Sequence, residues 1–447
     1  MLTAPMALLR RLNPFAGLPN PREVWAWGMY DLANQSFTLL INTLLFSVYF
    51  KEVIAGGGQA GDRLWSIVFS VSMFLVVLAS PVLGALADAK NWRKELLMAT
   101  GIGCVLFTCG LGLTGPGTVV LAFALYIPAN FCYQIGENTL ASFLPDIASM
   151  RTIGKISALG WMMGYVGALC LLLIVSVAMK VFGLGGTGQW RPLFVFAGVW
   201  FLLGMVPPML FLHERKRKVV LTHSNIVAEA VSRIADTVRH VRHYRQLMLF
   251  LLAFFIYAFG MQTVIAFAAI LAKDFGFQQT QLVLFVLQIT ITAGIAAAAT
   301  SRFQDRIGAK ATILIYLGVW IVSTSSLALI SGISGLPHWL LWVVGNGIGF
   351  GLGGTGTASR AMVGRFTPAH KAAEFFGLWG VSYKLAAAIG VLSFGLVKAG
   401  LGNTMALILL TSFFVVGMLL MIPVNELAGV RAAKRSERDL QLQRHAG

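Results

Sequence analysis

The stretch GALADAKNWRK at residues 84–94 recurs in altered form as SRFQDRIGAKA at residues 301–311. Asp88 of the first copy aligns with Asp305 of the second, and a basic residue follows five positions after each of them. Each copy lies between the second and third of six apolar segments, so the copies occupy equivalent places in two consecutive sets. This internal repeat predicts a chain built from two related halves.

Apolar residues make up 57% of the 447 positions and charged residues only 11%, far below the roughly one-quarter charged content of soluble domains. Segments of about 20 apolar residues, long enough to cross a bilayer, recur along the chain. We predict an all-α integral membrane protein with twelve transmembrane helices in two six-helix bundles. The expected spans are 24–50, 64–87, 95–114, 118–144, 156–182, 190–212, 246–271, 280–300, 311–331, 338–364, 375–398 and 403–424.

The net charge is +17, and the basic residues are distributed unevenly among the loops. Most Lys and Arg residues outside the spans fall in the N-terminus, the even-numbered loops and the C-terminal tail, which predicts that both termini are cytoplasmic and that the protein lies in the cell membrane. Basic clusters at 215–218 and in the tail then indicate topology signals and contacts with anionic lipids. The sequence lacks an aromatic-interleaved basic domain, so nucleic acid is not an expected partner. The tail cluster comprises Arg431, Lys434, Arg435 and Arg438.

The chain divides near its middle, at the longest polar stretch. Within it, Val227, Val231, Ile234, Val238 and Val241 repeat with helical spacing, which predicts an amphipathic helix on the cytoplasmic membrane surface. The predicted division is a cytoplasmic N-terminus (1–23), an N-terminal bundle (24–212), a basic linker (213–245), a C-terminal bundle (246–424) and a cytoplasmic tail (425–447). We expect a monomer.

The two repeated loops resemble the signature loop of the major facilitator superfamily, in which a Gly and three residues precede an Asp, an Arg or Lys, one residue, a Gly and further basic residues. An acid at a helix end beside cationic side chains can latch helices together on the cytoplasmic side until the halves rock apart. The matching positions are Gly84, Asp88, Arg93 and Lys94 in the first copy and Asp305, Arg306, Gly308 and Lys310 in the second.

Further segments resemble the fungal vacuolar amino-acid effluxers linked to autophagy and their bacterial relatives. They are YDLANQSF at 30–37, LPDIA at 144–148, the glycines of 160–167 and EFFG at 374–377. The resemblance runs across nearly the whole chain. It implies a facilitator of twelve helices and points to amino acids as the solute, with muropeptides, sugars or lipid-like anions as alternatives.

Several other classes of site are disfavoured. Gly345, Gly349 and Gly353 lie within a dinucleotide-like pattern, but no strand or βαβ unit surrounds it, and their spacing of four indicates close helix packing instead. The cysteines lack metal-ligand spacing, and neither G-x-S-x-G nor H-E-x-x-H occurs, so we expect no cofactor, no metal and no enzyme. A non-transporting receptor or scaffold would normally carry a larger soluble extension.

Four charges inside the expected spans carry the functional hypothesis. Asp31 and Glu137 belong to the first half and Arg360 and Lys384 to the second, and all four lie at a similar depth. Ionisable residues at membrane depth are costly and usually functional. We expect Lys384 and Arg360 to hold a carboxylate of the solute, and Asp31 or Glu137 to exchange a proton. The alternative is a buried ion pair that only fixes helix packing.

The first span adds a polar stripe to this group. Asp31, Gln35, Thr38 and Asn42 follow at steps of 4, 3 and 4, with Asn34 beside them, which places them on one side of an α-helix. Such a stripe in a membrane requires a water-lined cavity or a protein partner. Asn34, Gln35 and Thr38 are therefore included in the predicted site for solute and ions.

Overall fold

The computed structural model describes residues 15, 18, 20–148, 152–215, 239, 244–333, 339–368 and 371–446. Nearly all of these residues are helical, and no strand occurs among them. This agrees with the requirement that a chain in lipid must satisfy its own backbone hydrogen bonds. The amphipathic helix predicted between Val227 and Val241 falls outside the described residues, apart from Arg239.

The first half, called the N half below, contains the helices before the linker. Its first span, Pro21–Ile54, is continuous but changes its winding from α to π and back along its length. The elements are α2 (Pro21–Gln35), η1 (Ser36–Leu44), α3 (Leu45–Tyr49), η2 (Phe50–Ile54), α4 (Gly58–Lys90), α5 (Arg93–Gly110), η3 (Leu111–Leu113), α6 (Val119–Ser142), α7 (Leu144–Ile147), α8 (Ile153–Val181), η4 (Thr187–Gln189) and α9 (Arg191–Phe211).

The second half, called the C half below, follows the linker and precedes a helical tail. Its elements are α11 (Arg245–Asp274), α12 (Gln279–Ile307), α13 (Ala309–Gly332), α14 (Trp339–Phe366) and α15 (Ala372–Met421), and the tail forms α16 (Glu426–Ala446). Gly402 has a φ of 87° and a ψ of 176°, so it interrupts α15 and divides it into two successive spans.

The described helices account for twelve spans. Ten stretches are long and apolar enough to cross a membrane, and one of them, Glu374–Met421, contains the break at Gly402 and contributes two spans. The glycine-rich α14 is long enough but too low in hydropathy to be counted among the ten, and it supplies the twelfth span. The prediction of an all-α, twelve-helix membrane protein is confirmed.

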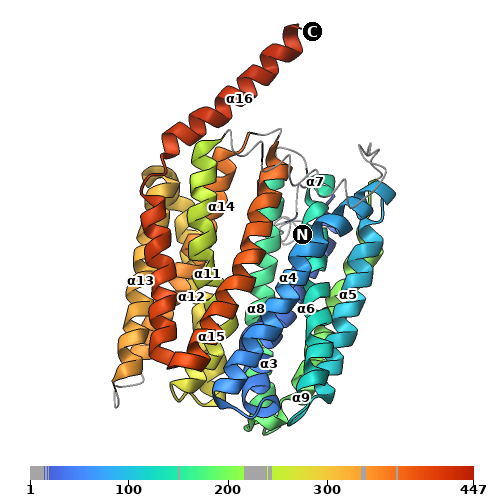
Figure 1. Ribbon diagram of the computed structural model, residues 1–447. Helices are drawn as coiled ribbons and strands as arrows, with labels where there is room; N and C mark the ends of the chain where they lie inside the picture. Colours follow the sequence, from blue (N-terminus) through green and yellow to red (C-terminus); the bar gives the residue numbers. More distant parts are fainter. Residues whose placement is uncertain are drawn as a thin grey trace, which may run out of the picture.

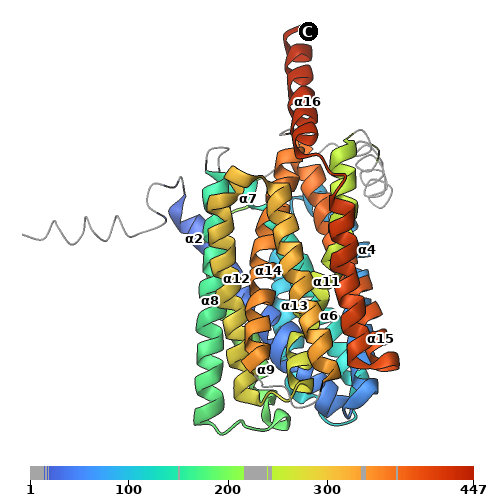
Figure 2. The same cartoon turned by 90° about the vertical axis from the view of Figure 1, so that its left-hand side faces the viewer.

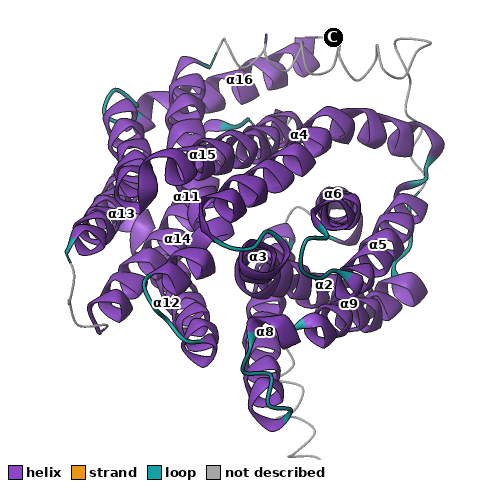
Figure 3. Cartoon of the chain, turned by 60° about the horizontal axis from the view of Figure 1, so that its bottom comes forward, coloured by secondary structure: helices purple, strands orange, loops and turns teal. Residues whose placement is uncertain are grey.

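The helices gather in two groups that meet along a central plane. Figure 3 shows α11 to α15 on one side and α2 to α9 on the other, with α4 against α15 and α8 against α12 where the groups meet. Apolar side chains such as Leu78, Leu106 and Leu203 are exposed on the outside of the bundle, as lipid-facing residues are. The protein is therefore a multi-pass membrane protein.

The first and last described helices, α2 and α16, begin at the same end of the bundle, and α16 projects beyond it (Figures 1 and 2). We call this end the termini face and the opposite end the far face. The loops 54–58 and 274–279 follow the first and seventh spans. Because each odd-numbered span ends at the face opposite the termini face, both loops belong to the far face.

The glycines of α14 bring this helix against α12. A Cβ atom at Gly353 would overlap the carbonyl oxygen of Ala293, and one at Gly349 would lie 2.8 Å from the carbonyl oxygen of Ile289. At Gly345 a Cβ atom would overlap the ring of Phe285. Small residues allow such close approach of two backbones in a membrane, so the packing interpretation of this stretch is confirmed.

Candidate functional site

The four charged residues predicted for the site lie together between the halves. Asp31 is on α2 and Glu137 on α6, whereas Arg360 is on α14 and Lys384 on α15. Asp31 interacts electrostatically with Glu137 and Arg360, and Glu137 interacts with Arg360 and Lys384. The structure thus brings two acids from the N half and two bases from the C half into one connected group, called the four-charge group below.

A hydrogen bond crosses from one half to the other at Lys384. Its Nζ atom donates to Oε1 of Gln134 at 2.6 Å and lies 3.3 Å from the carbonyl oxygen of the same residue. Gln134 is buried on α6, three positions before Glu137, so both side chains lie on one face of that helix. Gln134 was not predicted for the site because it is neutral, although its spacing of three positions from Glu137 indicates that both lie on one helix face.

Solvent reaches the four-charge group. Arg360 is exposed, and Asp31, Glu137 and Lys384 are half-buried, although each lies on a helix near the plane where the halves meet. Asn138, next to Glu137, is also exposed. Because charged groups inside a membrane protein usually line a watery path, this exposure indicates an aqueous space beside the group.

An aromatic surface adjoins the two cations. The guanidinium carbon of Arg360 lies 5.9 Å from the centre of the Trp379 ring, within the range of a cation–π contact. Trp379 stacks on Tyr383, with ring centres 6.2 Å apart and planes 8° apart, and both rings contact Phe254. Arg360 therefore has an aromatic flank on one side.

Two glycines of α8 leave room for the polar residues of α2. A Cβ atom at Gly160 would lie 2.9 Å from Oδ2 of Asp31, and one at Gly164 would lie 3.4 Å from Nε2 of Gln35. Asn34 is buried, and its side-chain amide has no hydrogen-bond partner among the described residues. An unpaired buried amide is costly, which makes it a candidate contact for a bound solute or water.

The predicted single stripe on the first span is wrong beyond Gln35. Residues Ser36–Leu44 form a π-helix, whose wider turn rotates the later residues away from the α-helical register. Thr38 instead hydrogen-bonds the hydroxyl of Tyr133 on α6 at 2.7 Å, and Asn42 donates to Oδ1 of Asn130 at 3.2 Å. Thr38 and Asn42 thus have protein partners, whereas Asp31 and Gln35 lie beside α8.

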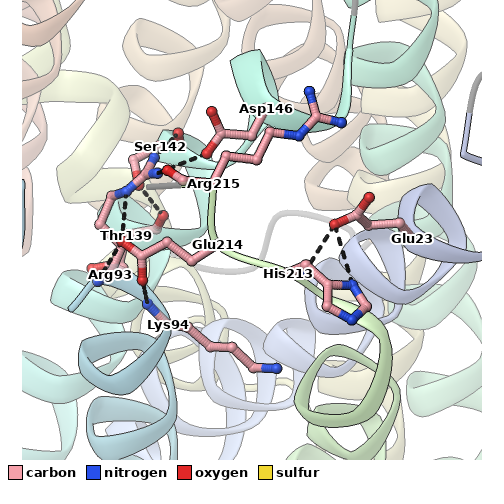
Figure 4. A network of polar contacts seen from close by, with 9 residues as sticks. All are labelled: Glu23, Arg93, Lys94, Thr139, Ser142, Asp146, His213, Glu214 and Arg215. Carbon is pink, nitrogen blue, oxygen red and sulfur yellow. Dashed lines mark hydrogen bonds and ion pairs between the residues drawn. The ribbon is translucent and has the colours of Figure 1, made fainter. Parts of the chain in front are cut away.

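The first signature loop lies at the termini face, where Arg93 joins three elements of the N half (Figure 4). Its guanidinium contacts Asp146 of α7 at 2.7 Å and Glu214 after α9 at 3.2 Å, and it donates to the carbonyl oxygen of Ser142 at 3.1 Å. Glu214 also accepts the backbone N–H groups of Arg93 and Lys94. The N-terminus of α5 is therefore capped by an acid from the end of the half.

The C half repeats this arrangement. Glu426, which follows the last span, accepts the backbone N–H groups of Ala309 at 3.1 Å and Lys310 at 2.9 Å. Arg365 of α14 joins Glu426 at 2.6 Å and Asp305 at 2.7 Å. We call Glu214 and Glu426 the capping glutamates, because each occupies the same position in its half.

Burial and hydrogen bonding act in opposite directions on Glu426. Burial favours its neutral acid, but the backbone N–H groups of Lys310 and Ala309 and the guanidinium of Arg365 outweigh that effect, so the pKa of Glu426 lies below its ordinary value. Hydrogen bonds to the charged form thus hold this acid ionised at the start of α13.

The remaining signature residues are placed as follows. Gly84 is exposed on α4 and has open space beside it, Asp88 lies near the end of α4, and Arg306 lies near the end of α12. Gly308, with a φ of 90°, ends α12 and begins α13. The ion pairs of Arg93 and Asp305 join helices within one half, so the latch between the halves stays a prediction for another conformation.

The far face is closed by contacts that sequence reasoning missed. Nε1 of Trp65 on α4 donates to the carbonyl oxygen of Ala266 on α11 at 3.0 Å. Nearby, Lys51 and Asp62 of the N half meet Asp274 and Lys398 of the C half in ion pairs. The described structure is thus closed at the far face. These charges were overlooked because they lie near span ends, where charges are ordinary.

Within the described residues, no three His, Cys, Asp or Glu side chains are grouped so that they could hold a metal ion. The site is a set of ionic and polar side chains that can bind a charged solute.

Comparison with known proteins identifies the family. The sequence profile described as Vacuole effluxer Atg22 like matches residues 62–434, well over half of the chain. The chain belongs to the Atg22-like effluxer family. An uncharacterized MFS-type transporter of Bacillus subtilis (strain 168), YxiO, is 23% identical to this Atg22-like chain over 411 residues, covering 90% of the chain and 94% of YxiO.

Fungal relatives are similar over a smaller share of their length. Autophagy-related protein 22 of Saccharomyces cerevisiae is 22% identical, with 83% of this Atg22-like chain and 79% of the yeast protein covered. Autophagy-related protein 22-1 of Aspergillus niger is 26% identical, and the match spans 68% of the chain but only 52% of that protein. The chain thus spans about half the length of the Aspergillus relative.

Solved structures of major facilitator transporters share the fold. A D-xylose–proton symporter superposes with a TM-score of 0.67 at 15% identity, covering 91% of this Atg22-like chain and 98% of the symporter. The nucleoside transporter NupG gives 0.66 at 13% identity, with 89% and 98% covered, and the human organic anion transporter MFSD10 gives 0.65 at 15% identity, with 90% and 99% covered. The protein is therefore a major facilitator transporter by fold and family, and it is not an enzyme.

Proposed function

We propose that this Atg22-like protein is a secondary active transporter for a small solute that carries a carboxylate, with amino acids as the first candidates. The observation that carries the proposal is the four-charge group, in which two acids of one half face two bases of the other. A zwitterion bound there would place its carboxylate toward the bases and its ammonium toward the acids. The solute would then bridge the halves where a facilitator must rearrange.

Each charged residue has a role in this proposal. Lys384 and Arg360 bind the carboxylate, and Asp31 and Glu137 bind the ammonium or take up a proton. Gln134 holds the ammonium of Lys384 when no solute is bound, so an arriving carboxylate takes the place of the Gln134 oxygen. The carboxylate adds its own negative charge to the hydrogen bond, which the neutral Gln134 oxygen cannot do, and the attraction between opposite charges favours the exchange.

The direction in which the site opens also belongs to the proposal. The far face is closed, whereas Arg360 is exposed and the other three charges are half-buried, so we propose that the site communicates with the termini face. From the sorting of basic loops we propose that the termini face is cytoplasmic in the cell membrane, that α16 contacts anionic lipid, and that the division into bundles at 24–212 and 246–424 holds for a monomer.

Uptake of labelled amino acids into proteoliposomes tests the carboxylate contact. Replacing Lys384 with Ala removes one charge-assisted contact, worth about 1.5–3 kcal/mol, and we expect at least about a tenfold loss of uptake. Lys371→Ala is the matched control, because Lys371 pairs with Glu374 at a helix end, 2.9 Å away, and has no role in the site. Normal transport by Lys384→Ala would overturn the proposal.

Proton coupling is tested separately with Asp31→Asn and Glu137→Gln. If either carboxyl carries the coupled proton, the matching variant loses its response to an imposed pH gradient while exchange of solute without a gradient continues. Full pH-gradient sensitivity in both variants would exclude both residues as the coupling site.

A ligand screen addresses the solute class. A ligand that binds only the folded protein stabilises it and so raises its unfolding temperature. At a ligand concentration of one hundred times the Kd, the free energy of unfolding rises by about 2.7 kcal/mol. The panel contains amino acids, dipeptides, muropeptides, sugars, nucleosides and lipid-like anions. Stabilisation by amino acids that disappears in Lys384→Ala would support the proposal, whereas stabilisation only by sugars or nucleosides would replace the solute class.

A further inference from the structure

Four charged side chains form a closed ring at the far face, and three of them, Lys51, Asp62 and Lys398, are buried. Lys51 of η2 contacts Oδ1 of Asp62 on α4 at 3.1 Å and Oδ1 of Asp274 on α11 at 2.6 Å. Lys398 of α15 contacts Oδ2 of Asp274 at 2.7 Å and also contacts Oδ2 of Asp62. Each lysine therefore touches both aspartates, and each aspartate touches both lysines. The ring carries no net charge.

The ring contains two kinds of contact. Lys51 with Asp62 lies within the N half, and Lys398 with Asp274 lies within the C half. The other two contacts, Lys51 with Asp274 and Lys398 with Asp62, cross between the halves. Side-chain exposures of 3–8% for the lysines and Asp62, and of 20% for Asp274, show that all four charges are largely removed from water.

This division decides what happens when the halves separate at the far face. Breaking a buried ion pair normally leaves an uncompensated charge, at a cost of about 3–5 kcal/mol. Here the two crossing contacts can break while each half keeps one lysine beside one aspartate. Both halves would then present a neutral pair, so the largest part of that cost is avoided.

We infer that Lys51, Asp62, Asp274 and Lys398 form the gate of the far face, a ring that parts into two neutral ion pairs, one on each half. The closed ring holds the far face shut, and the pairs within each half keep the open state accessible. The gate governs the conformational equilibrium of the carrier whatever solute it carries, so this inference does not rest on the proposed function.

The neighbouring packing fits a gate that closes tightly. A Cβ atom at Gly395 of α15 would overlap the side chain of Ser66 on α4, one turn from Asp62, and would lie 3.2 Å from the carbonyl oxygen of Asp62. The helices α4 and α15 thus meet directly at the ring. Such close contact requires that opposite charges, and not like charges, face each other across the plane.

Charge exchange within one half tests the gate. Lys398→Asp combined with Asp274→Lys preserves the net charge and the pair within the C half, but it places a lysine opposite Lys51 and an aspartate opposite Asp62. Juxtaposed like charges cost several kcal/mol, so we expect the ratio of open to closed far face to rise by at least about tenfold, which corresponds to about 1.4 kcal/mol.

Electron paramagnetic resonance distances report this ratio without any solute. Spin labels are attached through Gln59→Cys on α4 and Leu401→Cys on α15, both exposed at the far face, in a full-length chain whose four native cysteines are replaced by alanine. The parent protein is expected to show mainly the short distance, and the exchanged C half mainly a longer one.

The restoring variant exchanges the pairs of both halves, adding Lys51→Asp and Asp62→Lys. Every contact across the plane then joins opposite charges again, and we expect the short distance to return. The N half exchanged alone is the second route to an open far face, and size-exclusion profiles verify folding. A short distance in either folded single-half exchange, or a long distance in the folded fourfold variant, would overturn the inference.

Discussion

Replacing Arg93 with Ala should destabilise the protein far more than the corresponding change in the other half. Arg93 is only 3% exposed, and the side chains of its partners Asp146 and Glu214 are 5% and 9% exposed. Alanine deprives both buried carboxylates of this cation. Removal of one partner from a buried pair costs about 3–5 kcal/mol, and we expect a loss of this size.

The C half supplies the matched comparison. The side chain of Arg365 is 31% exposed and that of Asp305 78% exposed, so water screens their pair. Glu426 is 17% exposed, and it retains its two backbone N–H contacts when Arg365 is removed, as Glu214 does when Arg93 is removed. Exposed pairs contribute about 0–1 kcal/mol. Arg365→Ala should therefore cost about 1 kcal/mol, although it occupies a similar place in its capping network.

Thermal unfolding of the detergent-purified proteins, followed by tryptophan fluorescence, measures the difference. The fall in Tm for Arg93→Ala should be several times that for Arg365→Ala. Arg93→Lys should lie between, because an ammonium retains the charge but cannot reach both carboxylates and the Ser142 carbonyl as the planar guanidinium does. Equal losses at Arg93 and Arg365 would refute the argument that burial sets the cost.

Three further outcomes are expected. Gly353→Ala should lower stability by about 1–3 kcal/mol through overpacking against a carbonyl of α12, whereas Gly356→Ala, which meets open space, should be neutral or slightly stabilising; equal Tm values would contradict this. Because the pKa of Glu426 is lowered on folding, this carboxylate stabilises the folded protein above about pH 4.5, and the stabilisation is lost as the pH falls through the folded pKa. The Tm of Glu426→Gln should therefore fall less steeply than that of the parent protein from neutral to acidic pH, and parallel curves would exclude this contribution. Gln134→Met should lower the KM for solute about threefold to tenfold by freeing Lys384 from a competing acceptor worth about 1 kcal/mol; a higher KM would mean that Gln134 contacts the solute itself.

The sequence predicted the fold well because lipid imposes simple rules. Span length and apolar content identify the helices, and the repeated loops at 84–94 and 301–311 predicted the two halves. Even α14, whose glycines lower its hydropathy, was assigned to a span, because its length and its glycine spacing suit a packed membrane helix. The break at Gly402 lies between the expected spans 375–398 and 403–424.

The site was accessible from sequence only where a residue was unusual for its surroundings. Charges such as Asp31 and Lys384 are conspicuous in apolar spans, so their grouping was expected. Gln134 is neutral, and Lys51 and Lys398 lie near span ends, so nothing in the local pattern singled them out. The π-helix at Ser36–Leu44 was also missed, since the pattern of apolar and polar residues in this segment was read with an α-helical repeat.

The capping glutamates have a consequence for how the chain is made. Glu214 is the first residue beyond α9 that ties the end of the N half back to α5, and it lies at the start of the linker. Once it has left the ribosome, both carboxylates that pair with Arg93 and the Ser142 carbonyl have been synthesised, and the first half can close before the second begins to emerge. Because domains generally fold as units during synthesis, N-terminal first, Glu214 would mark the point of translation at which the first bundle becomes complete.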